Sequence, residues 1–131
     1  MHITGLYAAL SALLLVVLGY RVIARRHGER IGIGDNGDRE LAKRVRAHAN
    51  AAEYLPIGLI LMLALEWNQT LPWILHLFGV VFILGRILHA WGMSSSSGPS
   101  KGRIFGMILT LTSLIGMSLL LLWQFLLGAT I

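Results

Sequence analysis

Residues 104–131 have the sequence IFGMILTLTSLIGMSLLLLWQFLLGATI, which contains no formal charge. An α-helix rises about 1.5 Å per residue, so roughly 20 apolar residues cross the hydrocarbon core of a bilayer. This segment is long enough to cross a membrane as one tilted helix. It therefore indicates an integral membrane protein.

Three further apolar segments precede this one. We expect helices over residues 3–26, 41–66, 71–93 and 103–127, which form a single domain, 1–131, with an all-α fold of four transmembrane helices. The composition agrees, because only 13% of the 131 residues are charged, against about 25% in soluble domains. The first segment has no basic residue before it and no small-residue cleavage site after it, so we expect it to be a retained anchor rather than a signal peptide.

The basic residues predict the orientation of the helices. They gather in the first link between segments (Arg21, Arg25, Arg26, Arg30, Arg39, Lys43, Arg44 and Arg46) and in the third link (Lys101 and Arg103), whereas residues 67–72 hold none. The positive-inside rule then puts both basic links in the cytoplasm and both termini on the other side of the membrane. Because the cations lie between apolar runs, anionic headgroups or an anionic ligand suit them better than nucleic acid.

Several chemistries have little support in the sequence. Residues 32–37, GIGDNG, match the dinucleotide-binding fingerprint. No strand precedes them and no βαβ unit fits between two membrane spans, so we interpret them as a polar turn. The chain has no cysteine, and its histidines do not cluster, so we expect no metal site.

The segment RAHANAAEYLP, residues 46–56, is the most informative about function. On a helix, Arg46, Asn50, Glu53 and Tyr54 fall within roughly one third of the circumference, and His48 lies on another side. The helix thus presents polar groups to two neighbours, which suits a seam between subunits.

Charged groups at this depth cost about 2.5 to 3.5 kcal/mol each, so we expect them to have a ligand or a pairing role. One alternative is an Arg46–Glu53 ion pair that only fixes helix packing. Against it, we expect Arg25, Arg26, Arg86 and Arg103 to lie at the same surface with too few acids to neutralise them. An exogenous anion fits that imbalance.

These residues resemble the MAPEG family, the membrane-associated proteins of eicosanoid and glutathione metabolism. The pattern Arg-x-x-x-Asn-x-x-Glu-Tyr-x-Pro is met by Arg46, Asn50, Glu53, Tyr54 and Pro56. The double arginine Arg25-Arg26 and Arg103 at the foot of the last helix also match. The resemblance covers nearly the whole chain and is to a bacterial member of the microsomal glutathione transferase type, which implies the inner membrane.

The resemblance implies a homotrimer with one glutathione site per subunit interface. Glutathione would be held by Arg46, Asn50, Glu53 and Tyr54 of one subunit and by Arg25 and His48 of its neighbour. Arg103, with Arg26 as second choice, would stabilise the glutathione thiolate, which attacks a small hydrophobic electrophile from the bilayer. The chain departs from the family pattern where His48 replaces a frequent glutamine, and where His89 and Met93 replace two tyrosines. His89 either contacts the ligand or caps its helix.

Three functions of different classes are compatible with these residues. The favoured one is a glutathione-dependent transferase or peroxidase. The second is a non-catalytic MAPEG-fold scaffold that binds a lipid or thiol ligand. The third is a small efflux transporter, which is disfavoured because Glu53 lies near the expected cytoplasmic end of its helix rather than midway.

Overall fold

The computed structural model describes residues 3–95 and 98–128. Within them the chain forms four helices: α1 (Ile3–Glu29), α2 (Arg39–Trp67), α3 (Pro72–Ser95) and α4 (Lys101–Leu127). All four are long and apolar enough to cross a membrane. The expected four-helix membrane architecture is therefore confirmed, although α1 continues past residue 26 and α2 begins two residues before residue 41.

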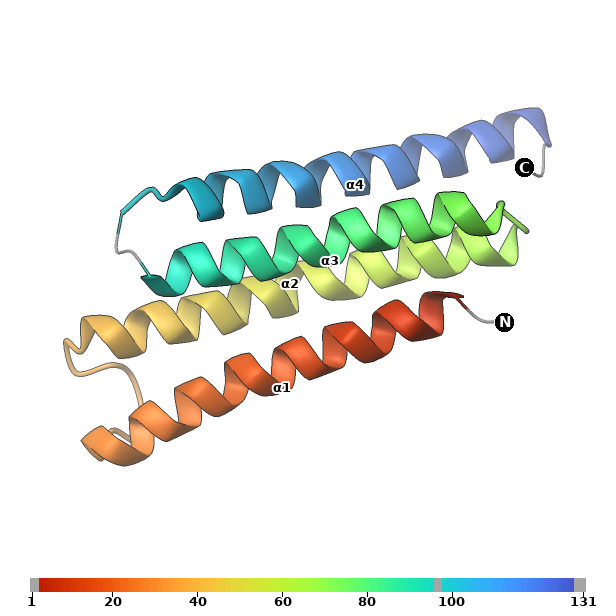
Figure 1. Ribbon diagram of the computed structural model, residues 1–131. Helices are drawn as coiled ribbons and strands as arrows, with labels where there is room; N and C mark the ends of the chain where they lie inside the picture. Colours follow the sequence, from red (N-terminus) through yellow and green to blue (C-terminus); the bar gives the residue numbers. More distant parts are fainter. Residues whose placement is uncertain (1–2, 96–97, 129–131) are drawn as a thin grey trace.

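The helices run antiparallel along one another, with α2 and α3 in the middle and α1 and α4 on opposite sides of them (Figure 1). The α1–α2 and α3–α4 connections lie at one end, which we call the basic end. The α2–α3 link, the start of α1 and the end of α4 lie at the other, the far end. The two basic links therefore share one end of the bundle, and the assignment of that end to the cytoplasm stays a prediction.

Local capping fixes where the helices of the basic end begin. The Asp38 carboxylate accepts hydrogen bonds from the backbone N–H groups of Glu40 (2.9 Å) and Leu41 (3.3 Å) at the start of α2. The Ser100 hydroxyl accepts one from the backbone N–H of Arg103 at the start of α4. Such caps satisfy N–H groups that the first helical turn leaves free.

Glycines let the backbones of α3 and α4 approach closely. A Cβ atom added to Gly106 would lie 2.3 Å from the backbone nitrogen of His89, and one added to Gly92 would lie 2.3 Å from that of Arg103. Small residues allow such contacts between membrane helices. This packing sets His89 beside α4 and Arg103 beside the last turns of α3.

Candidate functional site

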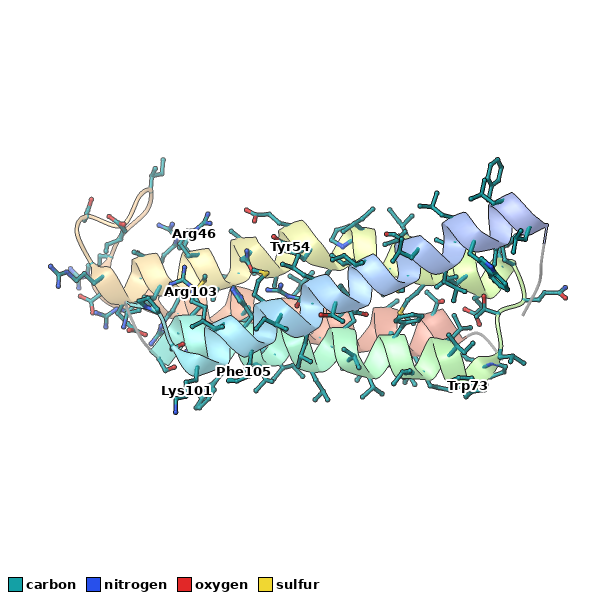
Figure 2. All side chains as sticks on the ribbon, turned by 90° about the horizontal axis from the view of Figure 1, so that it is seen from above. Arg46, Tyr54, Trp73, Lys101, Arg103 and Phe105 are labelled. Atoms are coloured by element: carbon teal, nitrogen blue, oxygen red, sulfur yellow. The ribbon has the colours of Figure 1, made fainter. Side chains whose placement is uncertain are left out.

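A pocket of about 540 Å³ opens between α2, α3 and α4 at the basic end. Its polar lining comes from Arg46, Asn50, His89 and Arg103, and its other lining residues are Met93, Pro99, Ile104, Met107, Ile108 and Leu111. Figure 2 shows Arg46 and Arg103 toward the same end of the bundle, opposite the end that carries Trp73. Four of the predicted site residues, from three helices, thus meet in this basic-end pocket.

The inner wall of the pocket is held by Arg86, whose side chain is fully buried. Its guanidinium donates hydrogen bonds to Asn50 Oδ1 (2.7 Å), His89 Nδ1 (3.2 Å) and Thr110 Oγ1 (3.4 Å). It also lies 5.1 Å from the centre of the Tyr54 ring, within reach of a cation–π interaction. Because Asn50 and His89 line the pocket, Arg86 lies directly behind its wall.

The structure contradicts one expectation about these charges and removes one alternative. Arg86 does not lie at the surface with the other arginines, because it points into the packed interior between helices. Arg46 and Glu53, both described by the structure, are exposed and form no ion pair with each other. Within the described residues, therefore, no carboxylate is hydrogen-bonded to Arg46, Arg86 or Arg103.

His89 does not cap the end of its helix. It is buried, lies well before the end of α3 at Ser95, and accepts from Arg86 through Nδ1. A guanidinium has no acceptor atom, so Nδ1 must be unprotonated in this contact. His89 is thus part of the wall between Arg86 and the pocket.

Five predicted site residues do not line this pocket. Glu53 is exposed midway along α2, not near the end of its helix as expected, and Tyr54 lies against Arg86. The other three, Arg25, Arg26 and His48, lie on the α1 side. Arg25 donates to Asp38 (2.8 Å) and pairs with Glu29 (2.9 Å), and the hydrogen bond from Arg25 holds the pKa of the Asp38 carboxyl below its usual value. Arg26 donates to backbone carbonyls of the following loop. His48 faces Gly19 of α1. As the sequence indicated, α2 presents polar groups on two sides, and a single chain does not bring them into one site.

Sequence reasoning missed the position of Arg86. The spacing of Arg86 and His89, three residues apart, puts both on one face of α3. That face contacts α4 through Gly85, where an added Cβ atom would lie 2.9 Å from the backbone nitrogen of Thr110. Gly85 beside Arg86 indicates that another helix can approach here, but a glycine alone does not show that the arginine is buried.

Comparison with known proteins identifies the family. The model of the MAPEG family matches residues 4–123 of the chain. The chain belongs to the MAPEG family. The resemblance found from the Arg46–Pro56 pattern is thus confirmed, and the fold described above is that of a MAPEG membrane protein.

Two curated proteins are similar to the chain over most of its length. Both are called "Inner membrane protein YecN", one from Escherichia coli strain K12 and one from an O6:H1 strain of the same species. Each is 39% identical over 121 residues, which cover 92% of this chain and 91% of the relative. With four membrane-spanning helices, this similarity supports a multi-pass protein of a bacterial inner membrane.

Proposed function

We propose that this MAPEG protein binds glutathione in the basic-end pocket and acts as a glutathione-dependent transferase or peroxidase on hydrophobic electrophiles. One observation carries the proposal. The pocket has Arg46 and Arg103 in its lining and Arg86 behind its wall, with no carboxylate hydrogen-bonded to any of the three among the described residues. Arg86 is buried and Arg103 half-buried; such cations without acids are costly in a membrane, so an anionic ligand is expected to neutralise them.

Glutathione has groups that complement those of the pocket. One of its carboxylates suits Arg46 and the other would bind Arg25 of a neighbouring subunit, since guanidinium groups bind carboxylates with two parallel hydrogen bonds. Its ammonium suits the exposed carboxylate of Glu53. Asn50 and Tyr54 would bind its amides. Arg86 would not touch glutathione. It would orient Asn50 and His89 through its hydrogen bonds and add positive charge next to the pocket.

The chemical step needs a glutathione thiolate. Lowering the pKa of a thiol by about two units requires roughly 2.7 kcal/mol of preference for the anion, which a nearby guanidinium can supply. Arg103 is our candidate for this role. The thiol proton would leave to water at the open mouth of the pocket. In the transferase reaction the thiolate would form a bond to the electrophilic carbon while the leaving group departs with its electron pair. In the peroxidase reaction it would attack a peroxide oxygen and break the O–O bond; the alcohol leaves after taking a proton from water, and a second glutathione reduces the sulfenic acid to give glutathione disulfide and water.

The apolar side of the pocket supports a hydrophobic second substrate. Ile104, Ile108 and Leu111 lie on one stripe of α4, line the pocket and are exposed on the outside of the bundle. In a membrane such a stripe faces lipid. An electrophile dissolved in the bilayer could therefore reach the pocket without crossing water.

A homotrimer would complete the site. Arg25 and His48 lie on the α1 side of the chain, away from the pocket lining, and a second copy could bring them to the pocket from outside. This arrangement rests on the family resemblance and on the two polar faces of α2. It predicts that Arg25→Ala and Arg46→Ala subunits complement each other when mixed.

A non-catalytic scaffold that binds a lipid or thiol ligand is the second candidate. Met93 favours it, because this side chain lines the pocket and cannot donate a hydrogen bond to a sulfur anion or to a leaving group. The scaffold would bind glutathione without converting its thiol to a thiolate.

Ultraviolet absorbance of the thiolate separates these candidates. Purified protein is titrated with glutathione, and the same titration is made with Arg103→Gln and with Lys101→Gln as a matched control. Lys101 is exposed on the same helix and does not line the pocket. We expect a thiolate signal with the unchanged protein and with Lys101→Gln, and its loss with Arg103→Gln. Binding without a thiolate signal in the unchanged protein would favour the scaffold, and no binding would contradict the transferase or peroxidase and a glutathione-binding scaffold alike.

A further inference from the structure

A second pocket, of about 780 Å³, lies at the end of α1. Its lining includes Ile23, Arg26, His27 and Arg30, which follow the helical spacing i, i+3, i+4 and i+7, together with Gly28, Ile31 and Gly32. These four residues therefore form one stripe, which continues into the loop that follows α1. This α1 pocket shares no lining residue with the basic-end pocket.

The cations of the α1 pocket are not neutralised by the acids nearby. Arg26 donates to the backbone carbonyls of Gly34 (2.9 Å) and Gly32 (3.4 Å), which hold its guanidinium in place but carry no charge. Glu29 and Asp38 are both paired with Arg25 instead. Arg30 is exposed, and its side chain has no hydrogen bond or ion pair to another described residue.

Apolar side chains border these cations. Ile23, on the pocket wall, is 64% exposed on the outer face of α1. Ile33, one residue beyond the pocket lining at Gly32, is 93% exposed. Isoleucine side chains in water at the end of a membrane helix are unfavourable, but they are favourable where headgroups meet acyl chains. The pocket thus combines cations with lipid-facing apolar surface at the end of a spanning helix.

We propose that the α1 pocket binds the phosphodiester headgroup of an anionic phospholipid, with an acyl chain lying along α1 over Ile23. Arg26 and Arg30 would bind the phosphate oxygens, since guanidinium groups suit phosphate geometry. Basic pockets at the ends of spanning helices bind anionic headgroups in this way. A lipid fits better than free phosphate because the pocket wall at Ile23 is apolar and open to the bilayer. The proposal does not depend on glutathione binding.

Lipid selectivity of the protein in bilayers tests the proposal. The protein is reconstituted in phosphatidylcholine, and the association of spin-labelled phosphatidylglycerol is compared with that of spin-labelled phosphatidylcholine. We expect a preference for phosphatidylglycerol, which Arg30→Asn lowers by up to about fivefold. Asparagine suits this position because Arg30 has a φ of 55°, in the left-handed region that asparagine tolerates. Arg26→Gln is the second variant, and circular dichroism checks that each variant keeps its helices.

Arg39→Gln is the matched control. It removes the same charge from an exposed position at the basic end, at the start of α2, outside the α1 pocket, so the preference should persist. Equal association of the two lipids with the unchanged protein would overturn the proposal. Equal losses of the phosphatidylglycerol preference in Arg39→Gln and Arg30→Asn would also overturn it, because they would show that the overall charge of the basic end attracts the lipid rather than a specific site. Inorganic phosphate that abolishes the preference at constant ionic strength would assign the pocket to a free anion instead. If Arg26→Gln does not fold, Arg30→Asn and its control decide the outcome.

Discussion

The two ends of the bundle differ in whether their polar side chains find partners of matching charge within the chain. At the far end Gln124 donates to Thr70 (2.9 Å) and accepts from Asn68 (3.1 Å). The Tyr7 hydroxyl lies 3.0 Å from His76 Nδ1. At the basic end Arg86 is held by neutral groups only, and Arg46 and Arg103 line an open pocket without an acid partner among the described residues.

Two carboxylates, Glu66 and Glu53, show a related contrast. At the far end Glu66 lies at the start of α1 and accepts hydrogen bonds from the backbone N–H groups of Ile3 and Thr4. Glu53 lies midway along α2, is exposed and pairs with no cation among the described residues, whereas Glu29, Asp38 and Glu40 at the basic end are ion-paired. Polar groups that find partners within the chain stabilise the fold, whereas those that do not are available to a ligand. The basic-end pocket is therefore the better candidate for a ligand site.

The largest expected effect comes from Arg86→Met. Methionine is long and unbranched, so it fills much of the same space without the charge. We expect glutathione affinity to fall about 10- to 100-fold, because charged hydrogen bonds contribute about 1.5–3 kcal/mol. Thermal stability without ligand should change little, because the removal of an unneutralised cation from the interior is offset by the loss of the donor to Asn50 Oδ1 and His89 Nδ1. Unchanged affinity with lower stability would make Arg86 a structural residue and remove the contrast between the ends.

Gly106→Ala tests how the basic-end pocket is built. The added Cβ atom would meet the backbone of His89 and the carbonyl of Gly85, so α3 and α4 must separate. We expect a loss of about 1–3 kcal/mol of stability, measured by unfolding in mixed detergent micelles, together with weaker glutathione binding. Gly28→Ala is the control, because nothing lies within 4 Å of its added Cβ atom. A Gly106→Ala protein with the control's stability would mean that these backbones do not touch.

Glu66→Gln probes the far end and has the smallest expected effect. The change removes a negative charge beside the start of α1, where a carboxylate contributes about 0.3–1 kcal/mol. We expect a loss of stability of that size and no change in glutathione affinity. Glu53→Gln should do the reverse, with weaker binding and unchanged stability. If Glu66→Gln weakened glutathione binding as much as Glu53→Gln does, the division between the two ends would fail.

Hydropathy and charge were enough to predict the helices and the end that gathers the cations. The 3.6-residue period also put Asn50 and His48 on different sides of α2, as the structure has them. The period could not separate Arg46 and Glu53, which are exposed, from Asn50, which is buried. A stripe one third of the helix wide includes residues at its margin, which reach the surface, as well as residues that face the neighbouring helices.

The position of Arg86 could not be predicted in the same way. A lone arginine late in an apolar segment is also typical of a residue at the membrane surface. Its burial depends on the register of α3 against α4, which the contact between Gly106 and His89 sets. Such a register brings together residues that are distant in the sequence. Because one sequence does not reveal the register, it does not decide whether Arg86 is buried or lies at the membrane surface.

Calorimetric titration with glutathione and with its diethyl ester tests the central claim most directly. The ester keeps the thiol, the amides and the ammonium but lacks both carboxylate charges that the arginines of the site are proposed to bind. We predict that glutathione binds to the protein and that the ester binds at least about tenfold more weakly, as expected when charge-assisted hydrogen bonds are lost. Equal affinity for the two compounds, or no binding of glutathione, would contradict the account.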